Sequence, residues 1–274
     1  MSVGLALAVL LAASNPTGVR FERSFDEAMK KARAQRKPVM IDFWAEWCGW
    51  CHRLDKTTYV DPAVVKLSQD FVAAKVDTEG SRGDMLVAER FDVTSLPTIL
   101  FVTPGGHQVL RVNGFQGPGK FPRTLESAKE AALKIMGYET ALEKNPRDPA
   151  ATAALGTHLF EQELFAEARS LLSRATRDDG SEPSGTRRQT RMLLAIIQNF
   201  DRKYADAEAL LKEGLAIRPV GEDEAKLLFI LGRTYMKWDR PEDARKIMQQ
   251  IVLRHPQSPM APKAQEQLAQ LAQR

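Results

Sequence analysis

Residues 41–52 constrain the fold of this chain more than any other stretch, because they join a buried-strand pattern to two closely spaced cysteines. The run 38–44 is apolar except for Asp42, as in a central strand that is covered on both faces. Cys48 and Cys51 follow this run, and the residues after them favour a helix. We therefore expect a buried strand, a short turn, and a helix whose N-terminus carries both cysteines.

These two cysteines are the only ones in the 274 residues. A small exported domain that is held by disulfides has several well-spaced cysteines, so a close pair indicates chemistry or ligation instead. At a helix N-terminus, unpaired backbone amides and the helix dipole favour a thiolate over a thiol. We predict that Cys48 is the nucleophile and that Cys51, one turn further along, attacks the mixed disulfide.

Two other interpretations of the cysteine pair stay open at this point. The motif could be an inactive structural copy. The spelling Cys-x-x-Cys-His, which ends at His52, is also the formal pattern of a c-type haem attachment site.

The composition is that of a globular protein, and the length suggests two domains. Hydrophobic residues make up 43% and charged residues 27%, which excludes general disorder. The net charge of +4 is shared between the two halves, so we expect no nucleic-acid partner. We interpret the cluster of Arg187, Arg188 and Arg191 as a solvated helix face.

The N-terminus carries an apolar run that fits a secretory signal peptide. Residues 3–13 are small or apolar, a run shorter than the roughly 20 residues that span a bilayer. Small residues precede Asn15, although no Lys or Arg stands before the run. We predict that residues 1–15 are a signal peptide and that the protein is periplasmic or otherwise extracytoplasmic. A cytoplasmic location is the alternative.

The rest of the first half alternates helical and strand patterns. Ser24 and Glu27 form a capping box for a helix that should end near residue 35. A second helix should begin near Gly49 and be interrupted before Asp61, which caps another helix with a proline at its first position. Strands are expected at 71–77, 99–102 and 108–112, and helices at 84–90 and 121–136. This order predicts a mixed sheet with helices on its faces.

Two motifs of this half resemble the thioredoxin family. Residues 42–49 together with Cys51 are similar to the thioredoxin active-site segment, and Leu96-Pro97-Thr98 before a buried strand resembles that family's cis-proline turn. The resemblance covers residues 20–137. It implies an α/β thioredoxin-like domain with a mixed central sheet flanked by helices, and it implies thiol:disulfide oxidoreductase activity.

Within the superfamily, the chain is most similar to the C-terminal domain of DsbD-type thiol:disulfide interchange proteins. The similar features are Asp61-Pro62, the long connection 77–97, and Gly114-Phe115 before the last helix. This branch implies that the dithiol reduces protein disulfides and receives its electrons from a membrane-embedded thiol donor.

The resemblance also implies roles for residues around the cysteines. Asp42 matches the buried acid of thioredoxin, which would take the proton of Cys51 as that thiol attacks. Pro97 is expected in the cis form, which leaves the backbone of Leu96 free to pair with an extended substrate segment.

Three more residues are expected to border the substrate groove because they flank the thiols: Trp47, Gly49 and Trp50. Gly49-Trp50 replaces the Gly-Pro of thioredoxin. The lysine that the family places near its buried acid falls at Ala73 in this chain, and Lys75 lies two residues further along the same strand face.

The haem interpretation weakens within this resemblance, because His52 would have to be an axial ligand in a region that the fold already fills. A metal site is disfavoured as well, because two sulfurs need further ligands and no other histidine is nearby in the sequence. We expect no metal, and no cofactor beyond the redox-active disulfide.

Small residues recur at the same offsets three times in the second half. The sets are Gly156, Ala168 and Ala175; Ala195, Ala207, Gly214 and Pro219; and Gly232, Ala244, Ile251 and Pro256. Antiparallel helices need small residues where they cross closely, and proline ends a helix. The pattern resembles three tetratricopeptide repeats, with extra residues between repeats at 178–185. We predict an all-α helical-repeat domain at 145–274, closed by a capping helix at 259–273.

The sequence thus favours an exported thiol:disulfide oxidoreductase that reduces protein disulfides, with helical repeats that bind a protein partner or substrate. The alternative from another class is an adaptor, in which the repeats bind partners and the thioredoxin-like unit is structural.

Overall fold

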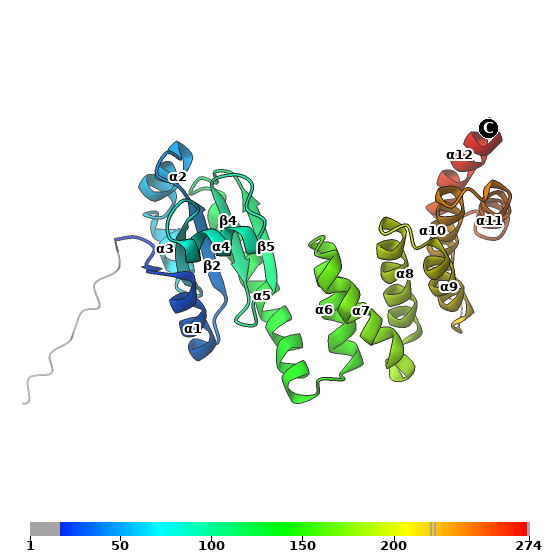
Figure 1. The fold of residues 1–274 in the computed structure, drawn as a ribbon, viewed down its shortest axis with the longest axis horizontal. Helices are drawn as coiled ribbons and strands as arrows, with labels where there is room; N and C mark the ends of the chain where they lie inside the picture. The colour runs from blue at the N-terminus through cyan, green and yellow to red at the C-terminus, as the bar shows by residue number, and fades with distance from the viewer. Residues whose placement is uncertain (1–16, 220, 222, 273–274) are drawn as a thin grey trace, which may run out of the picture. The chain divides into compact units, whose positions relative to one another are not determined.

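The computed structural model describes residues 17–219, 221 and 223–272 (Figure 1). The chain divides into two compact units, and the boundary in the sequence lies between Met136 and Gly137. The predicted signal peptide at 1–15 lies outside the described residues. In the described ranges, no helix is both long enough and apolar enough to cross a membrane.

The first unit is built around a five-stranded sheet in the order β1-β3-β2-β4-β5. The strands are β1 (Phe21–Glu22), β2 (Val39–Trp44), β3 (Val72–Asp77), β4 (Thr98–Val102) and β5 (Gln108–Asn113). Strand β3 pairs in parallel with β1 and β2, whereas β4 pairs antiparallel with β2 and β5. The predicted mixed sheet is confirmed. Strand β1 was not predicted, because two residues are too few to show a strand pattern.

Four helices lie within this unit: α1 (Phe25–Gln35), α2 (Gly49–Arg53), α3 (Pro62–Ser68) and α4 (Arg82–Arg90). A fifth helix, α5 (Phe121–Lys144), begins in it and continues into the second unit. A π-helical turn, Leu54–Thr58, separates α2 from α3. The caps agree with the sequence pattern: the Ser24 hydroxyl accepts a hydrogen bond from the Glu27 N–H at 3.2 Å, and Asp61 accepts one from the Ala63 N–H at 2.9 Å.

Helix α5 continues to Lys144, so its predicted end at residue 136 was wrong. The sequence after that point contains Gly137 and then residues that favour a helix. A glycine inside a helix costs only about 1 kcal/mol relative to alanine, which the surrounding helical turns can offset.

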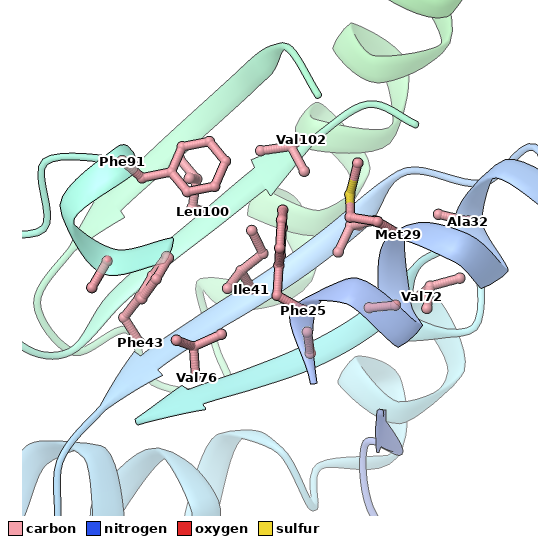
Figure 2. Close-up of a cluster of buried hydrophobic side chains, with 14 residues drawn as sticks. Phe25, Met29, Ala32, Ile41, Phe43, Val72, Val76, Phe91, Leu100 and Val102 are labelled. Carbon is pink, nitrogen blue, oxygen red and sulfur yellow. The ribbon is translucent and has the colours of Figure 1, made fainter. Parts of the chain in front are cut away.

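A cluster of buried apolar side chains fills one face of the sheet, and Figure 2 shows it. The cluster takes Phe25, Met29 and Ala32 from α1, Ile41 and Phe43 from β2, Val72 and Val76 from β3, and Leu100 and Val102 from β4. Successive side chains of a strand point to opposite faces. Asp42 lies between two members of the cluster and therefore points to the other face, as does Lys75, its register partner on β3.

The second unit is helical: α6 (Pro149–Glu161), α7 (Phe165–Arg177), α8 (Ser184–Phe200), α9 (Tyr204–Ala216), α10 (Glu224–Lys237), α11 (Pro241–Arg254) and α12 (Met260–Ala272). The helices form three pairs, and α12 packs on α11 (Figure 1). A Cβ atom at Gly156 would lie 3.0 Å from the side chain of Leu172 on α7, so this glycine permits the close crossing of the first pair.

The interpretation of Arg187, Arg188 and Arg191 as a solvated helix face was wrong. Arg188 and Arg191 are only 6% and 8% exposed. The extra residues between the first two helix pairs bring Asp179 back against Arg191, and Asp223 lies 2.8 Å from Arg188. These guanidinium groups are buried because carboxylates that are distant in the sequence pair with them.

Candidate active site

Cys48 and Cys51 form a disulfide with an S–S distance of 2.03 Å at the start of α2. Cys48 is the N-cap residue: its carbonyl accepts hydrogen bonds from the N–H groups of Cys51 and His52 at 3.0 and 3.2 Å. The Cys51 N–H also lies 3.2 Å from the Cys48 sulfur. Cys48 is 4% exposed and Cys51 is fully buried, so Cys48 is the more accessible of the two cysteines.

Asp42 is a fully buried carboxylate on β2, the strand that leads into the disulfide. Neither of its oxygens has a regular hydrogen bond within the described residues, and the Lys75 ammonium is 3.8 Å from Oδ2. Burial raises the pKa of Asp42 to about 7, because an ion in the apolar interior loses its hydration. The charge of Lys75 opposes this rise in pKa, and the charge of Asp55 adds to it.

Lys75 is shared between two carboxylates. Its ammonium is 2.5 Å from Asp55 Oδ1, closer than it is to Asp42. It also lies 5.0 Å from the centre of the Trp44 ring and 5.6 Å from that of Phe21, within cation–π range. The lysine of the thioredoxin family corresponds to position 73, which is an alanine in this chain. Lys75 contacts the buried acid in its place.

The π-helical turn brings two further residues to Asp42. Asp55 lies in this turn, and Tyr59 directly follows it. Tyr59 is buried, and burial, followed by the charge of Asp42, raises the pKa of its phenol well above the ordinary value. Sequence reasoning missed both residues. The available signal was that both follow Cys51 closely, on the helical segment that starts at the cysteines.

The Leu96–Pro97 peptide bond is cis, and it directly precedes β4. Thr98, the first residue of β4, is the register partner of Phe43 at the end of β2, so the proline turn and the cysteine turn lie at the same end of the sheet. The Pro97 carbonyl accepts a hydrogen bond from the Gly114 N–H at 2.8 Å. Within the described residues, no hydrogen bond uses the backbone of Leu96.

The two tryptophans of the motif are exposed, at 68% for Trp47 and 54% for Trp50. The Trp47 indole N–H donates a hydrogen bond to Glu79 at 2.7 Å. The Trp50 ring centre is 5.4 Å from that of Phe115, and the Arg53 guanidinium lies over both rings. These contacts restrain both indole rings. Trp47 precedes Cys48 in the sequence and Trp50 follows it.

Gly49 has no steric reason to be a glycine, because a Cβ atom there would meet nothing within 4 Å. The Nε2 atom of His52 donates to the Glu46 carbonyl at 2.7 Å. That nitrogen would have to leave this contact to bind an iron, and both cysteines of the formal haem pattern are already joined to each other. Over the described ranges, no group of three or more His, Cys, Asp or Glu residues is arranged to hold a metal ion.

Comparison with known families agrees with the division into two units. Residues 25–129 match a model described as a thioredoxin-like domain, and residues 138–183 and 201–271 match models of the tetratricopeptide repeat.

Curated relatives cover the first unit. The thiol:disulfide interchange protein DsbD of Ralstonia nicotianae is 33% identical over 118 residues, which are 40% of this chain and 19% of the relative. DsbD of Escherichia coli is 34% identical over 110 residues, which are 39% of this chain and 19% of the relative. The chain therefore spans less than a fifth of the length of these relatives.

Solved structures with some similarity include a thioredoxin from Thermus thermophilus, 29% identical with a TM-score of 0.37, covering 40% of this chain and 85% of that one. The oxidised C-terminal domain of Neisseria meningitidis DsbD is 21% identical with a TM-score of 0.36, covering 40% of this chain and 99% of that one. With the family models and the curated relatives, the conclusion is that the chain contains a thioredoxin-like domain with DsbD relatives, followed by tetratricopeptide repeats.

Proposed function

We propose that this protein is a thiol:disulfide oxidoreductase that reduces protein disulfides through Cys48 and Cys51. The observation that carries the proposal is the disulfide at the start of α2, with Cys48 as its more accessible cysteine and a buried acid, Asp42, on the strand before it. The thiol:disulfide interchange relatives of the domain support the same reaction class.

The first step uses the reduced protein. Cys48 is favoured as a thiolate because it caps a helix N-terminus. Its sulfur attacks one sulfur of the substrate disulfide, so a Cys48–substrate bond forms and the substrate S–S bond breaks. The departing substrate sulfur leaves as a thiolate and takes a proton from solvent.

The second step releases the substrate. Cys51 gives its proton to the Asp42 carboxylate, and its sulfur attacks the Cys48 sulfur. The Cys48–Cys51 disulfide forms, the mixed disulfide breaks, and the second substrate sulfur leaves as a thiolate that takes a proton from solvent. Two electrons have then passed from the dithiol to the substrate. Because Cys51 is fully buried, a buried acceptor serves it better than solvent does, and a pKa of about 7 leaves Asp42 partly ionised at neutral pH.

Substrate binding is assigned to the surface around Cys48. The free backbone of Leu96, next to the cis Pro97, would pair with an extended substrate segment. The exposed rings of Trp47 and Trp50 would contact its side chains, and Gly49 would leave room between them.

The reducing direction, the location and the partners belong to the proposal as well. The resemblance to the DsbD branch supports electrons that arrive from a membrane-embedded thiol donor and a site of action outside the cytoplasm. The tetratricopeptide repeats would bind a protein partner or substrate. No cofactor beyond the redox-active disulfide is required by these steps.

An insulin-reduction assay with dithiothreitol as the electron source tests the proposal. The protein should accelerate insulin reduction, and Cys48→Ser should lower the rate to that of dithiothreitol alone. Cys51→Ser is the matched variant: it keeps the nucleophile and should accumulate a mixed disulfide with substrate. If the folded protein and both variants are equally inactive, the reductase proposal fails and the adaptor becomes the better explanation.

A further inference from the structure

Two buried polar groups of the first unit lack regular hydrogen bonds. Within the described residues, neither carboxylate oxygen of Asp42 nor the hydroxyl of Tyr59 has a partner. Most buried polar atoms in proteins are paired, and an unpaired one costs about 1–3 kcal/mol. An acceptor and a donor left unpaired in the same region therefore need an explanation.

The two groups belong to one cluster. The Tyr59 ring packs edge-on between Phe21 and Phe121, with ring centres 5.3 and 5.9 Å away. The Phe21 ring also lies 5.6 Å from the Lys75 ammonium, which is 3.8 Å from Asp42. Tyr59 and Asp42 are close enough that the hydroxyl lowers the pKa of the carboxyl group and the carboxylate raises the pKa of the phenol.

We propose that Tyr59 is a positioning residue for Asp42, whose hydroxyl donates a hydrogen bond to the carboxylate whenever Asp42 is ionised. The proposal rests on the role of Asp42 as proton acceptor in the proposed function. When Asp42 is protonated, the hydrogen bond is no longer charge-assisted and loosens. Tyr59 thereby supports the ionised state of Asp42 without adding a charge.

The other groups that face Asp42 cannot serve in this way. Lys75, from β3, is held more closely by Asp55, from the π-helical turn, and Asp55 repels a second negative charge. Cys51, from α2, is the proton donor of the reaction when it is reduced. The phenol keeps its own proton at neutral pH because burial and Asp42 both raise its pKa. It is the neutral donor among these neighbours.

The first test is Tyr59→Phe in the oxidised full-length protein, where the cysteines do not titrate. The variant keeps the ring and removes only the hydroxyl. With ¹³C-labelled aspartate and Asp42→Asn to assign the signal, the titration midpoint of Asp42 should rise by about one pH unit, a tenfold change. A midpoint that does not move, or that falls, overturns the proposal.

A matched control is Tyr235→Phe. Tyr235 is a buried tyrosine of the second unit, and its hydroxyl donates to Glu208 at 2.6 Å. This variant should leave the titration of Asp42 unchanged. A measurement without substitution guards against a Tyr59→Phe protein that does not fold: in the wild type, the ¹³Cζ signal of Tyr59 should shift with the same midpoint as the Asp42 carboxyl signal. A flat Tyr59 signal contradicts the proposal.

The reduced protein connects the hydrogen bond to turnover. Tyr59→Phe should move the acidic limb of the insulin-reduction pH profile upward by the same amount, and it should have no effect in an Asp42→Asn background. A shift that persists in that background overturns the role of Tyr59 through Asp42. Because the titration of the oxidised protein needs no turnover, failure of the hydrogen bond is distinguishable from failure of the reductase activity.

Discussion

Asp42 in the first unit and Asp179 in the second are both buried carboxylates with positively charged neighbours. Asp179 accepts a hydrogen bond from Arg191, and Arg187 lies 3.5 Å away. Within the described residues, Asp42 has no regular hydrogen bond, and the cation 3.8 Å from it, Lys75, is shared with Asp55. Its pKa is about 7. A paired carboxylate is suited to hold a structure together, whereas an under-compensated one is suited to exchange a proton.

The largest effect on stability is expected where the pairing is tightest. Asp179→Asn removes the buried carboxylate beside Arg191 and leaves this guanidinium with the more exposed carboxylate of Glu213 at 3.2 Å. Removal of one partner of a buried ion pair costs up to about 3–5 kcal/mol. Helices α7 and α8 should exchange their amide hydrogens faster, as measured by mass spectrometry on the full-length protein. Exchange is the suitable measurement because two units need not unfold in one step.

Asp178→Asn is the matched control for this pairing, because the neighbouring Asp178 is exposed. It should leave exchange in both helices unchanged. Equal effects of the two substitutions would show that the loop, and not the buried ion pair, stabilises the second unit.

Asp42→Asn should do the opposite and stabilise the oxidised protein at alkaline pH. The pKa of Asp42 is about 7 in the folded protein against 3.8 for the ordinary group, so folding favours its protonated form. The wild type therefore loses stability as pH rises from about 4 to above 7, by at most about 4 kcal/mol. The asparagine has no such loss.

Hydrogen exchange of β2 in the full-length protein at pH 4 and pH 8, corrected for the intrinsic exchange rate at each pH, measures this difference. Asp42→Asn should gain about 2–4 kcal/mol over the wild type at pH 8 and little at pH 4. The exposed Asp26→Asn, on the first turn of α1, should not reproduce the pH dependence. A loss of stability at pH 8 would mean that Asp42 is as well compensated as Asp179.

Lys75→Met tests how much the ammonium group of Lys75 compensates the charge of Asp42. Without the ammonium, the attraction that lowers the pKa of Asp42 disappears, so its titration midpoint should rise above 7 by about one pH unit or more. The exposed Lys66→Met should leave the midpoint unchanged. Carboxyl ¹³C shifts of the oxidised protein provide the measurement. A midpoint that does not move would mean that the charge of Lys75 acts on Asp55 and not on Asp42.

The contrast between the two carboxylates also explains what the sequence could predict. Asp42 was recognisable because one acid interrupts an apolar strand run next to the cysteines. Asp55 and Tyr59 were not recognisable, because a π-helical turn sets their positions. The apolar periodicity of a sequence does not predict such a turn. The arginines of the second unit were misread because their partners, Asp179 and Asp223, approach only after the chain has folded back.

Glycines give the smallest predicted effects and extend the comparison to packing. Gly156→Ala places a Cβ atom 3.0 Å from Leu172, at a branch point that cannot swing away. Overpacking costs about 1–3 kcal/mol, and the better helix propensity of alanine offsets about 1 kcal/mol of it. We expect a net loss of about 1 kcal/mol in hydrogen-exchange stability of α6 and α7.

Gly49→Ala should be nearly neutral for stability, within about 0.5 kcal/mol. Apart from the chain neighbours and the backbone of its own helix, no atom of the described residues lies within 4 Å of the added methyl group. In the sequence the added methyl group lies next to Trp50 and two residues from Trp47, both exposed, so insulin reduction is the more informative measurement for this variant. A fall in turnover at unchanged stability would place Gly49 in the substrate-binding surface. Unchanged turnover would limit that surface to Trp47, Trp50 and the Leu96–Pro97 turn. Of the two glycines compared, size would then matter at Gly156, for helix packing, and not at Gly49.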